Sequence, residues 1–257
     1  MAHHQFRHIL ITGASSGIGE ALALAYAAAG VTLSLTGRNA ARLAAVCDAC
    51  AKRGAAADGV VLNVADADAV AAWITARDAT APLDLVIANA GISSSTDADS
   101  ASDGAAQTRR ILRVNIDGVV NTVLPTISAM RTRRRGQIAI VSSLAGFRDV
   151  GGNPAYGASK AAVRVWGEGL RRVLAADDIG VSVICPGFVR SRITDANRFH
   201  MPFFMEAPKA AAIIMAGLAA NRGRITFPWP MAALTWFFAA LPDRWATVFG
   251  KRLPEKT

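Results

Sequence analysis

Residues 8–19 read HILITGASSGIG and decide the fold, because an apolar run leads directly into a glycine-rich turn. The run His8–Thr12 predicts a buried strand, and the Ala/Leu-rich stretch from Gly17 to Ala29 predicts a helix that ends at Gly30. Glycines between a strand and a helix let the backbone turn tightly and approach an anion at the helix N-terminus. The pattern G-x-x-x-G-x-G in this context predicts a phosphate-binding loop. Its residues are Gly13, Ser15, Ser16, Gly17, Ile18 and Gly19.

The rest of the chain alternates short apolar runs with helical stretches. Further strands are expected at residues 31–35, 60–64, 83–88, 137–142 and 181–185, and helices at about 40–53, 66–76, 107–130 and 156–176. Continuously apolar strands are typical of a sheet that is covered on both faces. The sequence therefore predicts the α/β class, as a single-domain Rossmann-type doubly wound parallel sheet with helices on both faces, over residues 1–257.

Composition limits the function classes. The 257 residues carry a formal net charge of +9, but the 23 arginines and 5 lysines are scattered, which favours a solvated surface over a nucleic-acid interface. Cys47 and Cys50 fall in an expected helix with no second Cys/His pair at ligand spacing, so no metal site is expected. No apolar leader precedes the first strand, and three cysteines cannot all pair, which favours a reducing, cytoplasmic location.

The end of the second expected strand bears on the nucleotide. NAD-binding folds usually carry an acidic residue there to hold the ribose 2′-hydroxyl. This chain has Arg38 and no carboxylate between Leu35 and Ala41. A guanidinium suits a 2′-phosphate, so NADP(H) is the preferred cofactor, with NAD(H) as the alternative.

These motifs together make the chain resemble the classical short-chain dehydrogenase/reductase family, from about residue 7 to residue 195. The resemblance rests on six ordered motifs: Thr12–Gly19, Asn89-Ala90-Gly91, Asn115, Ser142-Ser143, Tyr156-Gly-Ala-Ser-Lys160 and Pro186-Gly187. It implies an oxidoreductase that binds a nicotinamide dinucleotide. Homodimers or homotetramers that pair the helices around residues 107–130 and 155–176 are also implied.

Tyr156 and Lys160 lie four residues apart at the start of a helix, so their side chains share a face. A tyrosine pKa of about 10 is too high for a good base at neutral pH, and a nearby ammonium is expected to lower it. Tyr156 can then exchange a proton with a substrate oxygen. The family pattern puts the oxygen-holding serine thirteen residues earlier, at Ser143.

The resemblance assigns the remaining site residues. Lys160 also holds the nicotinamide ribose, and Asn115 supports a water-linked proton relay to that lysine. Asn63-Val64 stands near the adenine where the family usually has an aspartate, and Ser191 stands where it has a threonine for the nicotinamide amide. The other expected cofactor-binding residues are Asn89, Ala90, Gly91, Tyr156, Pro186, Gly187 and Val189.

Two segments bear on the substrate. Residues 190–208 are expected to form an apolar lid that excludes water, or a helix packed on the core, and Leu144, Phe147 and Val150 are expected to add an apolar pocket wall. The C-terminal extension, 225–257, has no charge from Ile225 to Pro242 and carries several aromatic residues. We expect this extension to be covered by its own subunit or by a neighbouring subunit. The alternatives are that it closes the substrate pocket or that it lies on a membrane surface, and membrane contact is less favoured than cover by protein.

The sequence thus predicts an NADP-dependent oxidoreductase that transfers hydride between the nicotinamide and a carbonyl or secondary alcohol of a mostly apolar small molecule. The alternatives are an NAD-dependent alcohol dehydrogenase and a non-catalytic NADP-binding sensor or scaffold.

Overall fold

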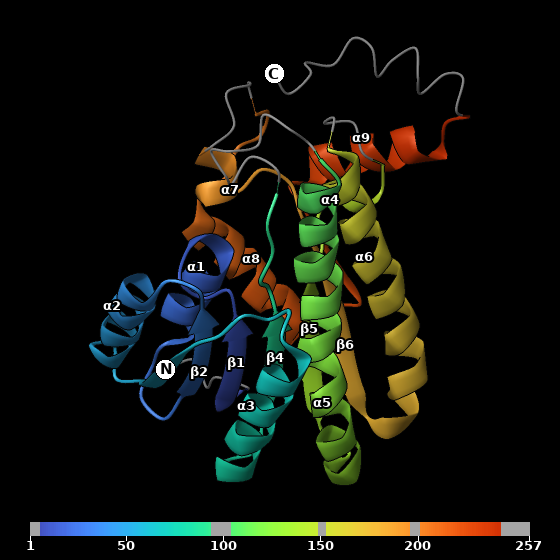
Figure 1. Cartoon of the computed structure of the whole chain (residues 1–257). Helices are drawn as coiled ribbons and strands as arrows, with labels where there is room; N and C mark the ends of the chain where they lie inside the picture. The colour runs from blue at the N-terminus through green and yellow to red at the C-terminus, as the bar shows by residue number, and fades with distance from the viewer. Residues whose placement is uncertain (1–5, 94–103, 149–152, 196–200, 243–257) are drawn as a thin grey trace.

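A computed structural model describes residues 6–93, 104–148, 153–195 and 201–242, which build one seven-stranded parallel sheet (Figure 1). The strand order is β3-β2-β1-β4-β5-β6-β7, with parallel pairing throughout. This confirms the predicted doubly wound parallel sheet. The strands are β1 His8–Thr12, β2 Thr32–Gly37, β3 Ala56–Val61, β4 Leu85–Ala88, β5 Gly136–Val141, β6 Ile179–Pro186 and β7 Arg224–Phe227.

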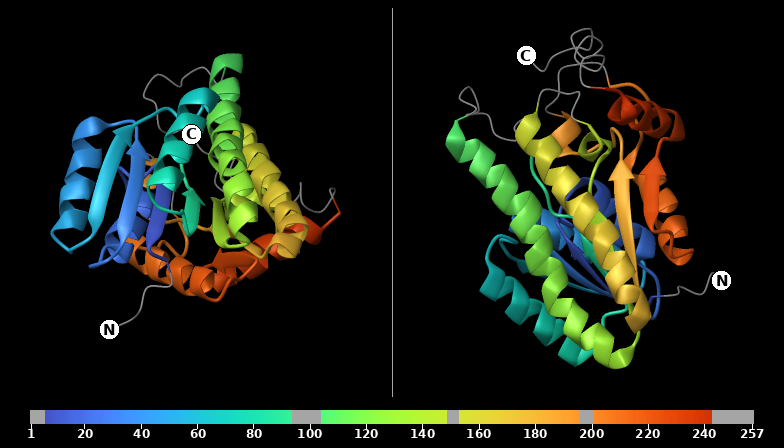
Figure 2. Two further views of the ribbon diagram at one scale, coloured as in Figure 1. Left: turned by 90° about the horizontal axis from the view of Figure 1, so that it is seen from below. Right: turned by 90° about the vertical axis from the view of Figure 1, so that its right-hand side faces the viewer.

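Helices cover both faces of the sheet, as the two turned views in Figure 2 show. The first face carries α1, α2 and α8, and the second carries α3, α5 and α6. The α-helices are α1 Gly17–Tyr26, α2 Ala40–Ala51, α3 Ala67–Thr80, α4 Ala105–Leu112, α5 Gly118–Arg133, α6 Pro154–Leu174, α7 Arg192–Asp195, α8 Ala207–Ala219 and α9 Trp229–Ala240.

The two faces hold separate hydrophobic cores, because successive side chains of a strand point to opposite sides. Ile9 and Ile11 of β1 pack with α1 and α8, whereas Leu10 packs with α3 and α5. Side-chain caps fix where helices begin: the Asn39 side chain accepts the Arg42 N–H at 2.9 Å, and the Asp66 side chain accepts the Ala69 N–H at 3.1 Å. The central strands are therefore buried on both sides, as their continuous apolar sequence predicted.

The strand order reverses at β1, which has β2 on one side and β4 on the other. In open parallel sheets, ligands bind beyond the carboxyl ends of the strands at this reversal. The fold thus brings the turns after β1, β2, β4, β5 and β6 to a single end of the molecule.

The structure differs from the expected secondary-structure elements in three respects. The third strand is Ala56–Val61 and not residues 60–64, and as an edge strand it is largely exposed, so a search for continuously apolar runs misplaced it. The single helix expected at 107–130 is interrupted by a π-helical turn, η2, at Arg113–Asp117. Helix α8 and strand β7 were not predicted, and β7 had been counted within the apolar C-terminal extension.

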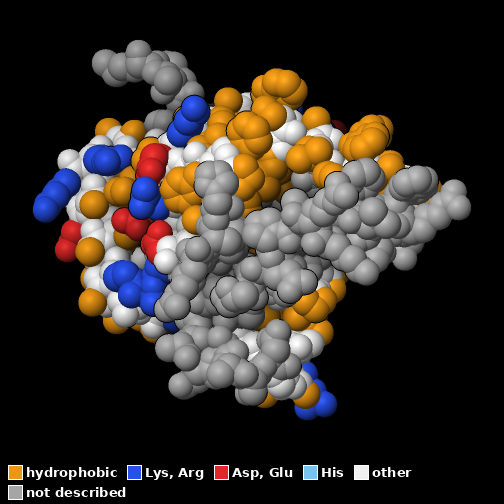
Figure 3. Space-filling model, turned by 90° about the horizontal axis from the view of Figure 1, so that it is seen from above, with side chains coloured by type: hydrophobic (Ala, Val, Ile, Leu, Met, Phe, Trp, Pro, Cys, Tyr) orange, Lys and Arg blue, Asp and Glu red, His pale blue; other side chains and the backbone are white. Residues whose placement is uncertain are grey.

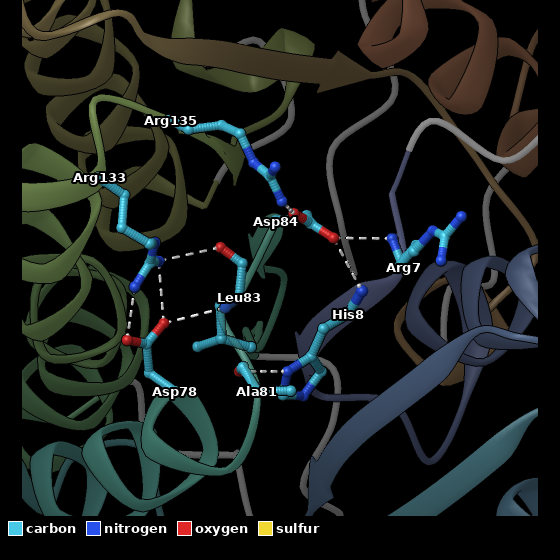
Figure 4. Close-up of polar contacts among 8 residues, drawn as sticks. All are labelled: Arg7, His8, Asp78, Ala81, Leu83, Asp84, Arg133 and Arg135. Atoms are coloured by element: carbon cyan, nitrogen blue, oxygen red, sulfur yellow. Dashed lines mark hydrogen bonds and ion pairs between the residues drawn. The ribbon is translucent and has the colours of Figure 1, made fainter.

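A polar cluster ties the amino ends of β1 and β4 to the ends of α3 and α5 (Figure 4). The Asp84 carboxylate accepts the backbone N–H groups of Arg7 at 2.8 Å and of His8 at 3.1 Å, and it pairs with Arg135. Asp78 pairs with both terminal nitrogens of Arg133, at 2.7 and 2.9 Å. These contacts hold the end of the sheet opposite the glycine-rich turn.

Helix α9 lies at the carboxyl end of the sheet, on the outside of the molecule (Figure 1). It contains no buried residue, and Trp229, Leu234, Trp236 and Phe237 are 53–78% exposed. Within the described chain the subunit itself therefore does not cover this helix, and cover by a neighbour, the other half of the expectation, stays a prediction. A short helix resting on the rim of the sheet has only one side against the protein. The remainder of the extension, 243–257, lies outside the described residues.

Candidate functional site

A cavity of about 410 Å³ lies at the carboxyl ends of the strands, where the strand order reverses. It brings together nearly all of the predicted site residues. Those that line it are Gly13, Ser15, Ser16, Gly17, Ile18, Arg38, Asn63, Val64, Asn89, Ala90, Gly91, Ser143, Tyr156, Lys160, Pro186, Gly187, Val189 and Ser191. Gly19 and Asn115 lie just behind this lining.

The glycine-rich turn makes a cradle that side chains would fill. Gly13 has φ +68°, and a Cβ there would lie 2.8 Å from the Ala90 Cα. Gly17 has φ +59°, and its Cβ would lie 2.9 Å from the Ser191 Cβ. Only glycine adopts these conformations cheaply in such confined space. The cradle opens onto the N-terminus of α1, so its free N–H groups fit the diphosphate of a dinucleotide.

Asn89 and Thr12 hold this turn against the end of β4. The Asn89 side-chain amide donates to the carbonyls of Thr12 at 2.9 Å and Gly13 at 3.1 Å. In return, the Thr12 hydroxyl accepts the backbone N–H groups of Asn89 at 3.1 Å and Ala90 at 3.2 Å. The sequence motif includes Thr12 but does not predict this role for it. Its position at the last residue of a strand, where ligand sites form, is the signal that could have indicated it.

The end of the cavity next to the start of α2 is cationic. Arg38 and Arg42 both line it, beside Gly37, and both are exposed. Among the described residues that line the cavity there is no Asp or Glu, whereas Arg110, Arg192 and Lys160 add further positive groups. Arg42 was missed in the sequence, although it stands four residues after Arg38, in the first turn of α2.

Asn63 and Val64 follow β3 and border the same end of the cavity. The Asn63 side-chain oxygen accepts the Ala65 N–H at 3.2 Å, and the Val64 carbonyl accepts the Asn121 side-chain amide at 3.0 Å. These bonds leave the Asn63 amide NH₂ as a donor for a ligand. The residues fit the adenine side of a dinucleotide.

Ser143, Tyr156 and Lys160 meet at the opposite end. Ser143 caps the turn that follows β5, where its hydroxyl accepts the Ala145 N–H at 3.1 Å. Tyr156 stands in the first turn of α6, which begins at the cap Asn153, and its phenol lies near the Ser143 hydroxyl. The Lys160 ammonium lies 5.7 Å from the centre of the Tyr156 ring.

Burial dominates the acid–base properties of this group. It raises the pKa of Tyr156, and the hydrogen bond from Ser143 lowers it only in part. The direction is opposite to the expected lowering of the tyrosine pKa by Lys160, because desolvation of the phenol outweighs the effect of its polar neighbours. Burial also lowers the pKa of Lys160 to about 8. At neutral pH the tyrosine is thus a protonated phenol and the lysine is mainly an ammonium.

Lys160 is buried and held by the end of β5. Its ammonium donates to the Val141 carbonyl at 3.0 Å, and its backbone carbonyl accepts the Ser142 hydroxyl at 2.7 Å. A Cβ on Gly91 would lie 3.2 Å from the Lys160 Nζ and 3.3 Å from the Asn115 Oδ1. Gly91 thus lies between the lysine and the asparagine, and a side chain at this position would displace one of them by a few tenths of an ångström.

Asn115 is fully buried in the π-helical turn η2. Its side chain accepts the Ile92 N–H at 2.8 Å and donates to the Ile92 carbonyl at 3.0 Å and the Ser159 hydroxyl at 3.0 Å. The π-helical turn explains how an asparagine inside a long helical stretch reaches the loop after β4, as π turns often occur at functional positions.

The segment after β6 closes one wall of the cavity. Thr194, which was not predicted, holds it: its hydroxyl accepts the Ser191 N–H at 2.8 Å and donates to the Val189 carbonyl at 3.0 Å. Of the expected lid, 190–208, Ser191 to Thr194 line the cavity, while Phe203 and Phe204 are exposed. Residues 196–200, with Phe199 of the expected lid, lie outside the described part of the chain.

The expected pocket wall after β5 is partly wrong. Leu144 and Phe147 do not line the cavity, because they pack with Cys185 and Met231 under the start of α9. The guanidinium groups of Arg164 and Arg224 lie 4.6 and 5.3 Å from the Phe147 ring centre. Val150 is not among the described residues. Apolar lining comes from Ile92, Val114 and Ile193 in their place.

Cys47 and Cys50 lie on α2 as free thiols, and burial raises the pKa of both. Within the described ranges, no three His, Cys, Asp or Glu side chains gather in a way that could hold a metal ion. None of the helices at residues 6–93, 104–148, 153–195 and 201–242 combines the length and apolar character needed to cross a bilayer.

Comparison with known proteins points to one family. The family model for short chain dehydrogenases matches residues 7–201. An uncharacterized oxidoreductase of Myxococcus xanthus is 39% identical over 254 residues, which cover 98% of this chain and all of that protein.

Two solved structures are similar over most of their length. A short-chain dehydrogenase from Sphingobium yanoikuyae in complex with NADPH has a TM-score of 0.78 and 25% identity, covering 96% of this chain and 93% of its own. A 3-oxoacyl-[acyl-carrier protein] reductase from Brucella melitensis with bound NAD has a TM-score of 0.73 and 27% identity, covering 88% and 89%. The matched model and these likenesses show that the chain belongs to the short-chain dehydrogenase/reductase family of NAD(P)-dependent oxidoreductases.

Proposed function

We propose that the protein is an NADP-dependent oxidoreductase that transfers hydride between the nicotinamide and a carbonyl or secondary alcohol of a mostly apolar substrate. The observation that carries the proposal is that Ser143, Tyr156 and Lys160 line the same cavity as the glycine-rich turn. A protein that only bound the nucleotide would not need a phenol, a hydroxyl and a buried ammonium beside one another.

The proposed roles follow from the protonation states. When bound, the nicotinamide supplies or accepts the hydride. In reduction, the Tyr156 phenol donates its proton to the carbonyl oxygen, and the Ser143 hydroxyl holds that oxygen in place. A tyrosine whose pKa is raised by burial remains a proton donor at neutral pH, which suits reduction. In oxidation the ionised form of Tyr156 accepts the proton from the alcohol, so this direction requires the phenolate.

Lys160 and Asn115 complete the proposed site. The Lys160 ammonium binds the ribose hydroxyls of the nicotinamide nucleotide and, once a substrate proton has moved, stabilises charge on Tyr156. Asn115 is a positioning residue, because its three hydrogen bonds join the loop after β4 to Ser159 on the helix of Tyr156 and Lys160. A water-linked relay from the lysine to this asparagine is part of the proposal.

The preference for NADP(H) rests on charge. Arg38 and Arg42 stand where the ribose 2′ position is expected, and the described cavity lining contains no carboxylate to hold a 2′-hydroxyl. The similar structures include one with NADPH and one with NAD, so an NAD-dependent dehydrogenase is the competing form of this proposal.

The apolar substrate is supported by Ile92, Val114 and Ile193 in the cavity lining. The Brucella melitensis relative is a 3-oxoacyl reductase, and a ketone on an apolar chain is a substrate of this class.

Two long helices also support association of copies, since Leu124 of α5 and Val165 and Val173 of α6 are 52–61% exposed. We propose a homodimer or homotetramer that pairs these helices.

The test is a panel of ketones and secondary alcohols with NADPH and NADH, followed at the nicotinamide absorbance band, for the wild type and two matched variants. Tyr156→Phe should lower kcat about a hundredfold or more while NADPH affinity changes little. Tyr26→Phe, a change at the only other tyrosine, in the core beside Phe6, should leave kcat unchanged. Retained activity of Tyr156→Phe would remove Tyr156 from its proposed role, and NADPH binding without turnover of any compound would favour the sensor or scaffold.

A further inference from the structure

Helix α9 is apolar on every side, although only one side touches the protein. Its sequence, WPMAALTWFFAA, contains no charged residue, and Thr235 is its only polar one. The exposed fractions are 78% for Trp229, 53% for Leu234, 65% for Trp236 and 55% for Phe237. A helix that is apolar all round is normally buried in protein or in lipid, so the outer face of α9 requires a cover.

The inner side of α9 is anchored, so the outer face has a fixed orientation. The Arg148 guanidinium donates to the carbonyls of Phe238 at 3.3 Å and Leu241 at 3.2 Å, which satisfies the C-terminal end of the helix. Thr235 donates its hydroxyl to the Met231 carbonyl at 2.8 Å. The helix therefore presents Leu234, Trp236 and Phe237 outward as part of the folded protein.

A second exposed apolar group lies at the same end of the molecule. Phe203 is 55% exposed and Phe204 is 36% exposed, and they immediately precede Met205, which forms a β-bridge with Val189. The end view in Figure 3 shows hydrophobic side chains gathered on this end of the molecule. Two apolar elements that are far apart in sequence thus share the end onto which the cavity opens.

Both elements rest on one wall of the cavity. A Cβ on Gly187 would lie 2.8 Å from the Met231 sulfur and 3.1 Å from Pro228, at the start of α9. Val189, two residues later, forms the β-bridge with Met205. Gly187 and Val189 both line the cavity. Whatever covers the outer face of α9 therefore lies next to the substrate end of the site.

The covering surface must accept aromatic side chains and tolerate positive charge nearby. Tryptophan is enriched at the boundary between lipid and water, where its ring is apolar and its N–H remains hydrated. Arg38, Arg42 and Arg192 are exposed and line the cavity at this end of the molecule, and the chain as a whole carries +9. Anionic headgroups are complementary to this charge.

A second copy of the chain fits the face less well. Twelve helical residues are about 18 Å long and roughly 10 Å wide, so α9 offers a footprint of roughly 200 Å². A stable protein interface needs about 800 Å² on each side.

We propose that α9, together with Phe203 and Phe204, docks on the surface of an anionic lipid bilayer. The helix lies in the interface plane, with Leu234, Trp236 and Phe237 among the upper acyl chains. The cavity mouth then faces the lipid, and the ketone or alcohol of the proposed function is a molecule that partitions into the bilayer. This last step rests on the proposed function, whereas the docking itself does not.

The experiment is flotation of the full chain with vesicles of phosphatidylglycerol and phosphatidylcholine, and with vesicles of phosphatidylcholine alone. Wild type should float with the anionic vesicles, and less so as salt is raised, because screening weakens attraction to headgroups. Leu234→Gln should reduce the fraction bound about fivefold, and Leu234→Gln with Trp236→Gln and Phe237→Gln should abolish binding. Val61→Gln is the matched control, since Val61 is 54% exposed but lies on the opposite edge strand, β3.

Quenching of tryptophan fluorescence by bromine-labelled acyl chains reports insertion directly. It should fall when Trp236 is replaced by phenylalanine, a change that preserves an apolar docking face. NADPH oxidation with a water-soluble ketone, measured without vesicles, tests the proposed chemistry separately, and the α9 variants should retain it. No flotation, equal loss in Val61→Gln, or flotation without quenching would overturn the docking proposal. Dissociation of an oligomer by Leu234→Gln, with no vesicle binding, would assign the face to a second copy.

Discussion

The Ser142 hydroxyl donates to the backbone carbonyl of Lys160 at 2.7 Å, and this bond joins the end of β5 to the helix of the proposed catalytic residues. The Lys160 ammonium returns to the same strand, at the Val141 carbonyl. The lysine is thus fixed to β5 at both its backbone and its side chain. The position of Tyr156, one turn earlier on α6, depends on the same connection.

Replacing Ser142 with alanine should lower kcat about tenfold, because loss of the bond lets α6 shift relative to Ser143. The cost in unfolding free energy should be about 1–2 kcal/mol, as for a typical buried hydrogen bond. Ser182→Ala is the control, since Ser182 is also buried but accepts from Gln137 away from the cavity. Equal kcat in both variants would show that the bond has only a structural role.

Replacing Arg38 with aspartate should shift cofactor preference from NADPH toward NADH, because the change removes a phosphate partner and adds an acceptor for the 2′-hydroxyl. Arg42→Gln should weaken NADPH binding and leave NADH binding unchanged. Lys52→Asp, which changes charge at an exposed position at the other end of α2, should affect neither. The measurement is titration of each variant with both nucleotides. Equal affinity of the wild-type protein for NADH and NADPH would contradict the argument from these arginines.

The rate of reduction at low NADPH should depend on the charge of Lys160. Burial lowers its pKa to about 8, so the ammonium is present below that pH and is lost as pH rises through it. We expect kcat/KM for NADPH to fall above about pH 8, since this quantity reports ionisations of the free enzyme. Lys160→Arg should remove the fall, because a guanidinium stays charged, even though its overall activity is lower. A flat profile for the wild type to pH 9.5 would exclude this role for Lys160.

The cluster of Figure 4 should make the protein sensitive to acid. Hydrogen bonds from the Arg7 and His8 N–H groups and the Arg135 guanidinium lower the pKa of Asp84 against the opposing effect of burial. A carboxyl whose folded pKa is lowered contributes stability above its unfolded value of about 3.9, and that contribution disappears as pH falls through the folded value. Asp84→Asn should therefore cost about 1–3 kcal/mol at pH 7 and less at pH 3, measured by urea unfolding. Asp48→Asn, at an exposed position on α2, should change neither value.

Association of copies should depend on the outer faces of α5 and α6. Leu124→Gln combined with Val165→Gln should reduce the molar mass found by light scattering at micromolar concentration, because both side chains are more than half exposed in the single chain. The protomer itself should keep its melting temperature within a few degrees. A wild-type monomer under these conditions would remove the basis for this prediction.

The central sheet was predictable from sequence because its strands are buried on both faces and therefore read as apolar runs. The edge strands β3 and β7 were not predictable in this way, because they do not form long, continuously apolar runs. Residues of β3 such as Asp58 and Val61 are exposed, and β7 is only four residues long, so neither strand stands out from its surroundings. The π-helical turn at Asn115 also leaves no periodic signal, since its extra residue is accommodated without a break in helical sequence.

Most site residues were predictable because each follows the end of a strand or starts a helix. Thr12, Arg42 and Thr194 were missed because their significance depends on partners far away in sequence or across a turn. The pKa of Tyr156 was mispredicted because sequence spacing reveals the nearby ammonium of Lys160 but not the depth of burial. The outward face of α9 was missed for the same reason, since an apolar sequence does not tell which side is left without a partner.

Arg38 and Arg42 lie in a cavity whose described lining contains no carboxylate, so no acidic lining residue stands beside them. A dinucleotide phosphate is a suitable counter-ion for these arginines, so we expect its binding to stabilise the folded chain. Because such a ligand binds the folded state and not the unfolded one, a concentration of NADPH one hundred times its Kd adds about 2.7 kcal/mol to the free energy of unfolding. We therefore expect the resistance of this protein to heat and proteolysis to rise with the concentration of nicotinamide dinucleotide around it.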